Sequence, residues 1–248
     1  MGREERKAKL KKFRQDRKLW YRNLKRVLKL KIKRPRFVFF GKQPETKSVV
    51  LSNHVGAYGP LTLEIYAQFP LRMWGTHHMN TSFKELWRYQ TQIYYHQKKG
   101  WNIHLARLFC LLASPLTYMF YKGLRLISTY QDHRFKITLR ESMEVLNNNE
   151  NIVIFPEDSN QGYLDKMTHF YNGFVMLCEV CFKRNMDLSI YTSYLRQKDN
   201  VVLFSAPVLY SELKEKVSSR EEIANYLLNQ CNALGKVDLK EITDDQFS

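Results

Sequence analysis

The stretch VVLSNHVGAYGP, residues 49–60, joins a short apolar run to a turn that contains a histidine. The run at 49–51 has the composition and length of a strand that is buried on both faces. His54 follows where such a strand ends, and Gly56 and Gly59 then interrupt the chain before the next helical pattern. A histidine in this position is a candidate general base.

Similar β-rich runs recur after residue 35, and helical patterns separate most of them. The further runs are RFVFFG (36–41), LRMWGT (71–76), LRLIST (124–129), NIVIFPE (151–157), LSIYTSYL (188–195) and NVVLFSAPVL (200–209). The helical patterns lie at about 59–68, 81–97, 102–121, 133–148, 167–185 and 218–234. Short strands that alternate with helices predict an α/β fold with a mostly parallel central sheet covered by helices.

The basic charge of the chain is concentrated at its N-terminus. The formal net charge is +16, and residues 1–36 hold seventeen lysines and arginines against three acidic residues, a net charge of +14. Apolar residues recur on one helical face through this segment. They are Leu10, Phe13, Trp20, Leu24, Val27 and Leu28, with Arg17 interrupting the stripe. A basic helix with an aromatic and aliphatic face is typical of a membrane interface.

We therefore predict two parts: a basic amphipathic membrane-interface helix at 1–35, binding anionic lipids, and an α/β domain at 36–248. One alternative for the first part is a solvated helix that packs on its own domain. A nucleic-acid-binding arm is the weaker alternative, because no recognisable reading module accompanies the charge. We do not expect a nucleic-acid partner.

The longest uncharged run is LFCLLASPLTYMFY at 108–121, with 14 residues. Because roughly 20 apolar residues are needed to span a bilayer, we predict a buried helix here and no transmembrane helix. A lining for an acyl chain and a shallow membrane insertion are the alternatives.

Cysteines and histidines do not form a recognisable metal-binding pattern. Cys178 and Cys181 have no second Cys/His pair at zinc spacing, and no carboxylate–histidine motif surrounds His77 and His78. We predict no metal site. The four cysteines lie in apolar or helical contexts, and no stretch resembles a secretory signal, so we predict a cytoplasmic location.

Glu157 follows the run NIVIF as His54 follows VVL. Ligands of open α/β sheets bind outside the carboxyl ends of the strands. If the two strands are parallel neighbours, His54 and the loop from Glu157 to Asn160 face one crevice. The loop side chains of Asp158 and Ser159 are then candidates for hydrogen bonds to a polar substrate.

Taken in order, these motifs resemble the 1-acylglycerol-3-phosphate acyltransferases and related glycerolipid acyltransferases. The matching stretches, within roughly 47–234, are SVVLSNH, GLRLIST, NIVIFPE, FYNGF and SAPVLY. The resemblance implies an α/β sheet at the cytoplasmic membrane surface. It also implies a histidine that deprotonates a lysophospholipid hydroxyl, an aspartate that orients the imidazole, and arginines that hold the phosphate of the acceptor.

The chain departs from the family pattern at three positions. The aspartate expected five residues after His54 is Gly59, the arginine of the second motif is Thr129, and Gly-Thr-Arg after Glu157 has become Asp-Ser-Asn. We predict that Asp158 replaces the missing aspartate, with Glu64 as the alternative. The lost arginines are compensated by other cations, or the acceptor carries no phosphate. The candidate substrate-binding residues are Asn53, Ser159, Asn160, Arg125 and Lys166, with Arg134 as a further cation.

The predicted function is acyl transfer from a thioester to a hydroxyl of a lysophospholipid or related glycerolipid, by a peripheral protein at the cytoplasmic face of the membrane. His54 is the predicted general base, with Asp158 and Glu157 as its catalytic partners. Acyl-CoA or an acyl carrier protein supplies the acyl group, and no bound cofactor is expected. The alternative is a catalytically silent relative that serves as a lipid-binding or adaptor module.

Overall fold

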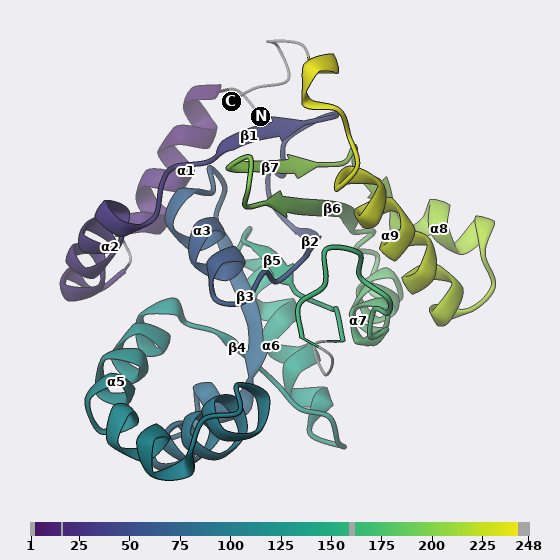
Figure 1. Ribbon diagram of the computed structural model, residues 1–248. Helices are drawn as coiled ribbons and strands as arrows, with labels where there is room; N and C mark the ends of the chain where they lie inside the picture. The colour runs from purple at the N-terminus through teal and green to yellow at the C-terminus, as the bar shows by residue number, and fades with distance from the viewer. Residues whose placement is uncertain (1–2, 16, 159–161, 243–248) are drawn as a thin grey trace.

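A single sheet organises the chain in the computed structural model, which describes residues 3–15, 17–158 and 162–242 (Figure 1). The strand order is β1-β7-β6-β2-β5-β3-β4, and β8 pairs with β6. The strands are β1 (Arg36–Phe39), β2 (Ser48–Ser52), β3 (Leu71–Thr76), β4 (Ile127–Thr129), β5 (Asn151–Ile154), β6 (Ser189–Arg196), β7 (Val201–Phe204) and β8 (Val208–Leu209). The strands β6, β2, β5, β3 and β4 run parallel, whereas β7 and β8 are antiparallel to β6. The predicted α/β fold with a mostly parallel sheet is confirmed.

Helices cover both faces of the sheet and create two cores. One core lies under α6 (Phe135–Asn147), α7 (Gly173–Phe182), α8 (Tyr210–Lys216) and α9 (Arg220–Leu234). The other lies under α2 (Leu19–Lys31), α3 (Tyr58–Tyr66) and the end of α5 (Ile103–Leu124). Strand β2 serves both, since Val49 and Leu51 face the first core and Val50 the second. Burial on both faces explains why its sequence is continuously apolar.

The N-terminal segment forms two helices, not the single one that its apolar spacing predicts. Helix α1 (Arg3–Gln15) ends before Arg17, and α2 begins at Leu19. Arg17 is buried, and its Nη1 donates to the carbonyl oxygens of Gly123 and Leu124 at 2.8 Å each. These carbonyls end α5, so the guanidinium caps the negative end of that helix. The residue that interrupts the apolar stripe is therefore an anchor to the domain.

Part of the apolar surface of α2 packs on the α/β domain, whereas Val27 and Leu30 are exposed. Tyr21 is fully buried, its hydroxyl donates to Glu64 Oε1 at 3.1 Å, and its ring fills the space beside Gly123. Trp20 and Leu24 pack on the same core. These side chains are therefore used within the protein, as in the alternative of a helix packed on its own domain. The basic side of the helix remains at the surface, with Arg26 and Lys31 exposed.

Helix α5 lies beyond the edge of the sheet, next to α4 (Phe83–Arg88) and the π-helix η2 (Tyr89–Lys98) (Figure 1). The prediction of a buried helix at 108–121 is wrong for most of its surface. Leu112 is 81% exposed and Leu116 is 68% exposed. The physical reason is the position of α5: it packs through one face on α4 and η2, and its other face has no sheet beneath it. By length and composition α5 could cross a membrane, with 17% of its most apolar window buried.

The remaining short helical turns are η1 (His77–Met79) and η3 (Leu239–Glu241). Turn η1 continues directly from the carboxyl end of β3, which places its two histidines at the same edge of the sheet as His54.

Candidate active site

His54 and Glu157 meet at the carboxyl edge of the sheet. Strands β2 and β5 are parallel neighbours in which Leu51 pairs with Ile154, so the residues three positions further on stand at the same level. The backbone N–H of His54 donates to Glu157 Oε1 at 2.6 Å. The two residues that the sequence places after separate strands are thus in direct contact, 103 positions apart in the chain.

A left-handed turn after His54 holds its imidazole. Val55 and Gly56 have φ angles of 46° and 63°, and the carbonyl of Gly56 returns to the Nδ1 of His54. Because a carbonyl oxygen only accepts, Nδ1 carries the proton and the lone pair lies on Nε2. A left-handed backbone is costly for a β-branched residue such as Val55, and such strain is typical of functional turns.

Gly59 is hydrogen-bonded to the same turn through its backbone. Its N–H donates to the carbonyl oxygen of His54 at 3.2 Å. A Cβ atom at this position would lie 2.3 Å from that oxygen, so the turn has room only for glycine. This explains why the aspartate of the resembled family cannot occupy position 59 in this chain.

Two aromatic rings flank the imidazole. The ring of Tyr163 stacks on His54 at a centroid distance of 4.9 Å, and Phe155 lies at 4.9 Å in a tilted arrangement. Phe155 belongs to the segment that follows β5, and Tyr163 to the loop after it. These contacts restrict the rotation of the imidazole, so Nε2 keeps one orientation toward an approaching hydroxyl group.

Glu157 is partly buried, and burial raises the pKa of its carboxyl to about 7. The hydrogen bond from the His54 N–H lowers the pKa and so offsets part of this effect. Backbone pairing holds the segment in place: Tyr171 N–H donates to Pro156 O at 2.8 Å, and Asp158 N–H donates to His169 O at 3.2 Å. Glu157 therefore anchors the His54 turn to a short antiparallel bridge with Phe170.

The predicted role of Asp158 as the group that orients the imidazole stays a prediction, because the structure records another acceptor at Nδ1 of His54. The sequence predicts a carboxylate as the group that orients the imidazole, but the acceptor at Nδ1 is the backbone carbonyl of Gly56. The left-handed turn at Val55 and Gly56 brings that carbonyl to the ring. Asp158 itself follows Glu157 in the loop beside this turn, and is partly buried. The alternative, Glu64, is also used elsewhere, since it accepts from Tyr21 and Lys25.

Asn53 is a structural residue in this fold. It is buried, and its Nδ2 donates to Leu195 O at 3.1 Å while its Oδ1 accepts from Leu195 N at 2.7 Å. Both ends of the amide thus join the end of β2 to β6. The amide of Asn53 therefore has a structural role, and its predicted contact with substrate stays a prediction.

The predicted cations do not gather around His54. Arg125 precedes β4 and ends α5 with a φ of 53°, on the side of Arg17, whose pKa its charge helps to lower. It is therefore at the amino end of its strand, not at the carboxyl edge. Lys166 lies exposed in the loop after β5. Ser159 and Asn160 lie outside the residues that the structure describes.

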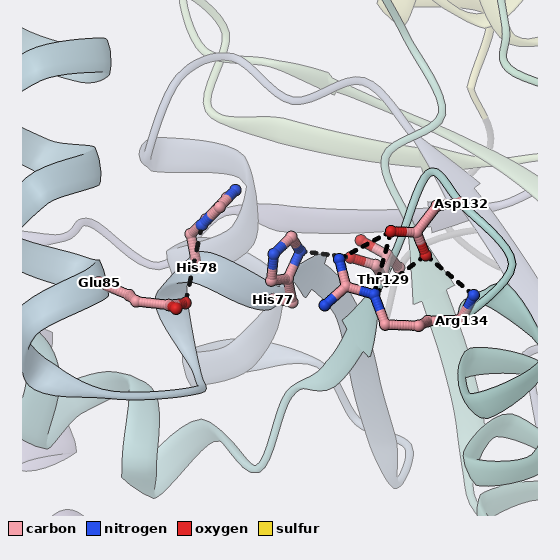
Figure 2. A network of polar contacts seen from close by, with 6 residues as sticks. All are labelled: His77, His78, Glu85, Thr129, Asp132 and Arg134. Atoms are coloured by element: carbon pink, nitrogen blue, oxygen red, sulfur yellow. Dashed lines mark hydrogen bonds and ion pairs between the residues drawn. The ribbon is translucent and has the colours of Figure 1, made fainter.

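A second cluster at this edge was not predicted as a site: His77, His78 and Glu85 (Figure 2). One ligand atom from each lies within 4.8 Å of the others. The two histidines follow β3 directly, and Glu85 stands in the first turn of α4 after the N-cap Ser82. The available signal was the pair of adjacent histidines after a strand. Glu85 joins them only through the path of the backbone between β3 and α4.

Polar neighbours surround this second cluster. His77 Nδ1 lies 3.3 Å from Thr129 O, and Arg134 forms a two-pronged ion pair with Asp132 at 2.7–3.0 Å (Figure 2). Burial and the charge of His77 lower the pKa of His78. Arg134, offered above as a compensating cation, is therefore already paired with a carboxylate.

A cavity of about 390 Å³ lies at the opposite end of the sheet, where β2 and β6 begin. Its lining includes Ser48, Ser189 and Tyr191. Ser48 and Ser189 start the strands whose carboxyl ends approach His54, so this cavity is separate from the candidate active site.

Comparison with known proteins finds no matching protein-family model and no matching curated protein. Among solved structures, the chain is similar to the 1-acyl-sn-glycerophosphate (LPA) acyltransferase PlsC from Thermotoga maritima. The identity is 14%, the match covers 96% of this chain and 84% of that chain, and the TM-score is 0.44. A likeness of this degree assigns no reaction, so the function is argued from this chain's own residues.

Proposed function

We propose that the protein transfers an acyl group from a thioester to a hydroxyl of a lysophospholipid or related glycerolipid, with His54 as the general base. The observation that carries the proposal is the Nδ1 contact of His54 with the Gly56 carbonyl. It fixes the tautomer with its lone pair on Nε2, the form that accepts a proton. Glu157, from the neighbouring strand, holds the same turn through the backbone N–H of His54.

The reaction follows from that tautomer. Nε2 takes the proton of the acceptor hydroxyl as its oxygen attacks the thioester carbonyl carbon. The carbon–sulfur bond then breaks, and the imidazolium returns the proton to the departing thiolate. The products are an ester and a free thiol, which would be coenzyme A or the pantetheine thiol of an acyl carrier protein. The Gly56 carbonyl stabilises the imidazolium that forms between the two proton transfers.

The surface of the chain supports action at the cytoplasmic face of a membrane. Helix α5 exposes Leu105, Leu108, Leu111, Leu112 and Leu116. The basic N-terminal helices supply positive charge that anionic lipid headgroups attract. In this proposal α5 inserts its leucines into the interface, and the basic residues of 1–35 contact the headgroups.

The enzyme is tested by measuring transfer from acyl-CoA, and from acyl carrier protein, to lysophosphatidate in lipid vesicles. Loss of a general base lowers the rate by about 100-fold or more, so His54→Ala should remove most of the transfer. His133→Ala, at an exposed histidine in the segment between β4 and α6, is the matched control and should retain it. Equal turnover by His54→Ala and the unchanged protein would refute the mechanism.

A silent lipid-binding module is the second candidate, and one observation favours it. The hydroxyl of Thr129 donates to Gly75 O at 3.0 Å, so the position of the family arginine offers no cation. An unchanged protein that binds lysophospholipid vesicles but transfers no acyl group from either donor would establish this candidate.

The membrane contact is tested separately with Leu108→Glu/Leu112→Glu. Burial of one leucine contributes roughly 1.5–3 kcal/mol, so the double change should weaken binding to anionic vesicles by at least about tenfold. Tyr226→Glu alters an exposed apolar residue on α9 and is the control. Binding should also weaken with salt if the N-terminal charge contributes. Vesicle binding that the leucine changes leave intact would contradict the role of α5.

A further inference from the structure

The carboxyl edge of the sheet carries a group of metal-ligating side chains that the proposed acyl transfer does not use. His77 and His78 form the turn η1, and Glu85 projects from α4 toward them (Figure 2). One nitrogen or oxygen from each of the three lies within 4.8 Å of the other two. All three side chains are partly exposed, so an ion can reach them.

We propose that His77, His78 and Glu85 bind a divalent transition-metal ion, and that Zn²⁺ is the ion their chemistry fits. Two imidazoles and one carboxylate match the ligand set of open zinc sites, in which a fourth position is left for water or a ligand oxygen. Such nitrogen-rich sites favour zinc over magnesium or calcium, which take oxygen ligands.

His77 is already oriented as a metal ligand. Its Nδ1 lies 3.3 Å from the carbonyl oxygen of Thr129, which accepts the Nδ1–H. The lone pair is then on Nε2. Metal-binding histidines typically donate their other ring N–H to a carbonyl or carboxylate in this way, which fixes the tautomer and the ring orientation.

The spacing between His78 and Glu85 suits an ion between them. Nδ1 of His78 lies 3.9 Å from Glu85 Oε2, longer than a hydrogen bond. Ligand bonds of about 2.0–2.2 Å at tetrahedral angles separate two ligand atoms by roughly 3.3–3.6 Å. A small side-chain rotation therefore converts the observed spacing into a ligand spacing, while the Ser82 cap holds the backbone of Glu85 at 3.2 Å.

The charges and rings around the three ligand side chains are compatible with a bound cation. Arg134 is a positive charge that acts on His78, and its guanidinium is bound in two-pronged fashion by Asp132. The Glu85 carboxylate therefore remains to attract the ion. Tyr130 stacks on His77 at 4.8 Å, and Tyr89 stacks on His78 at 5.7 Å. These rings limit the motion of both imidazoles.

The site lies on the same edge as the candidate active site but is independent of it. Met73 pairs with Val153, and Leu51 with Ile154. By this register, His54, Glu157 and His77 stand at one level on three neighbouring strands. An ion at His77 would be about 10 Å from His54, given strand spacings near 4.8 Å. Metal binding can therefore be established or refuted whatever the outcome of the acyl-transfer assay.

The experiment uses the full chain, stripped of metal with a chelator and then titrated with Zn²⁺ in competition with a chromogenic chelator. One Zn²⁺ per chain is expected. Replacing Zn²⁺ by Co²⁺ should give the visible absorption of a tetrahedral ion with nitrogen and oxygen ligands. His77→Ala, His78→Ala and Glu85→Gln should each weaken binding by at least about tenfold, whereas His104→Ala, at an exposed histidine elsewhere, should not.

Thermal unfolding in chelator checks that the variants fold, and little change is expected because the three side chains are partly exposed. Two results would overturn the proposal. One is Zn²⁺ binding of equal strength in His77→Ala and the unchanged protein. The other is stoichiometric binding that disappears in Cys178→Ser/Cys181→Ser and persists in Glu85→Gln, which would assign the ion to the buried cysteines.

Discussion

Two histidine turns stand at the same edge of the sheet, and they differ in how closely their groups are joined. His54 is held at two points: the Gly56 carbonyl accepts from its Nδ1, and the Glu157 side-chain carboxylate accepts from its backbone N–H. In the second turn a backbone carbonyl also accepts from a ring nitrogen, since His77 Nδ1–H donates to Thr129 O. The three side chains of His77, His78 and Glu85, however, approach one another without hydrogen-bond contact.

The difference shows how one sheet edge can prepare two kinds of chemistry. A proton-transfer base needs one ring nitrogen in one orientation, and a rigid backbone turn supplies that. A metal ion sets its own coordination geometry, so its ligands need the correct types and approximate positions, with side-chain rotation to complete the site. Rigidity of the backbone is therefore expected to matter at the first turn and much less at the second.

The largest expected effect is a difference in folding stability between two variants, in each of which a glycine beside one of the turns gains a methyl group. Gly59→Ala places Cβ 2.3 Å from the carbonyl oxygen of His54, and overpacking against a backbone atom costs about 3 kcal/mol or more. Gly75→Ala, two residues before His77, meets the flexible end of Leu126 at 2.9 Å. Its cost should stay under about 1 kcal/mol, because a side-chain end can move aside.

Denaturant unfolding of the two variants measures this difference, and acyl transfer should fall with Gly59→Ala alone. Similar losses of unfolding free energy in the two variants would break the comparison, since the His54 turn would then have no special need for glycine. Gly59→Asp, which restores the family residue, should behave like Gly59→Ala and not raise transfer.

The pH dependence of stability gives the next largest effect. Burial raises the pKa of Glu157 to about 7 from an ordinary value of 4.5. The folded state therefore holds the proton more tightly than the unfolded state, and this residue's contribution to stability falls as pH rises from about 4.5 to 7. Glu157→Gln keeps an acceptor for the His54 N–H without ionising, so it should remove that fall.

The advantage of Glu157→Gln over the unchanged protein should grow by on the order of 1–2 kcal/mol between pH 5 and pH 8. This is less than the full pKa shift would give, because the carboxyl is partly exposed to solvent. Unfolding curves at several pH values measure it, with the exposed Glu144→Gln as control. A constant difference across this range would mean that Glu157 is not the buried carboxyl that sets the turn.

The fold was largely predictable because its signals are local. The apolar runs became strands, and β2 is apolar throughout because both of its faces are covered. The errors came from tertiary contacts. Arg17 breaks the N-terminal helix because it binds the end of α5, and α5 is exposed because it lies beyond the sheet edge. The apolar periodicity of the N-terminal segment and of α5 gives no sign of these tertiary contacts.

The candidate site was likewise predictable where its signals are local, and not where it depends on tertiary contacts. The sequence places His54 and Glu157 after strands, and strand pairing brings them together. The group at Nδ1 was missed because a backbone carbonyl has no signature in residue types. Glu85 was missed because its approach to His77 depends on the turn between β3 and α4. Asn53 was assigned to substrate because its bonds to Leu195, 142 positions away, depend on the pairing of β2 with β6.

The smallest expected effect belongs to Asp158, and it decides which group orients the catalytic base. If the Gly56 carbonyl holds Nδ1, Asp158→Asn should lower acyl transfer by no more than about threefold, compared with the 100-fold or larger loss expected for His54→Ala. The imidazole ¹⁵N resonances of His54 should show the same tautomer, with the proton on Nδ1, in both proteins. A loss that approaches that of His54→Ala, together with a change of tautomer, would instead make the Asp158 carboxylate the orienting group, because residues that act as one unit lose activity together. The His54 ring would then be oriented by a carboxylate side chain, whereas a backbone carbonyl, that of Thr129, accepts from the His77 ring.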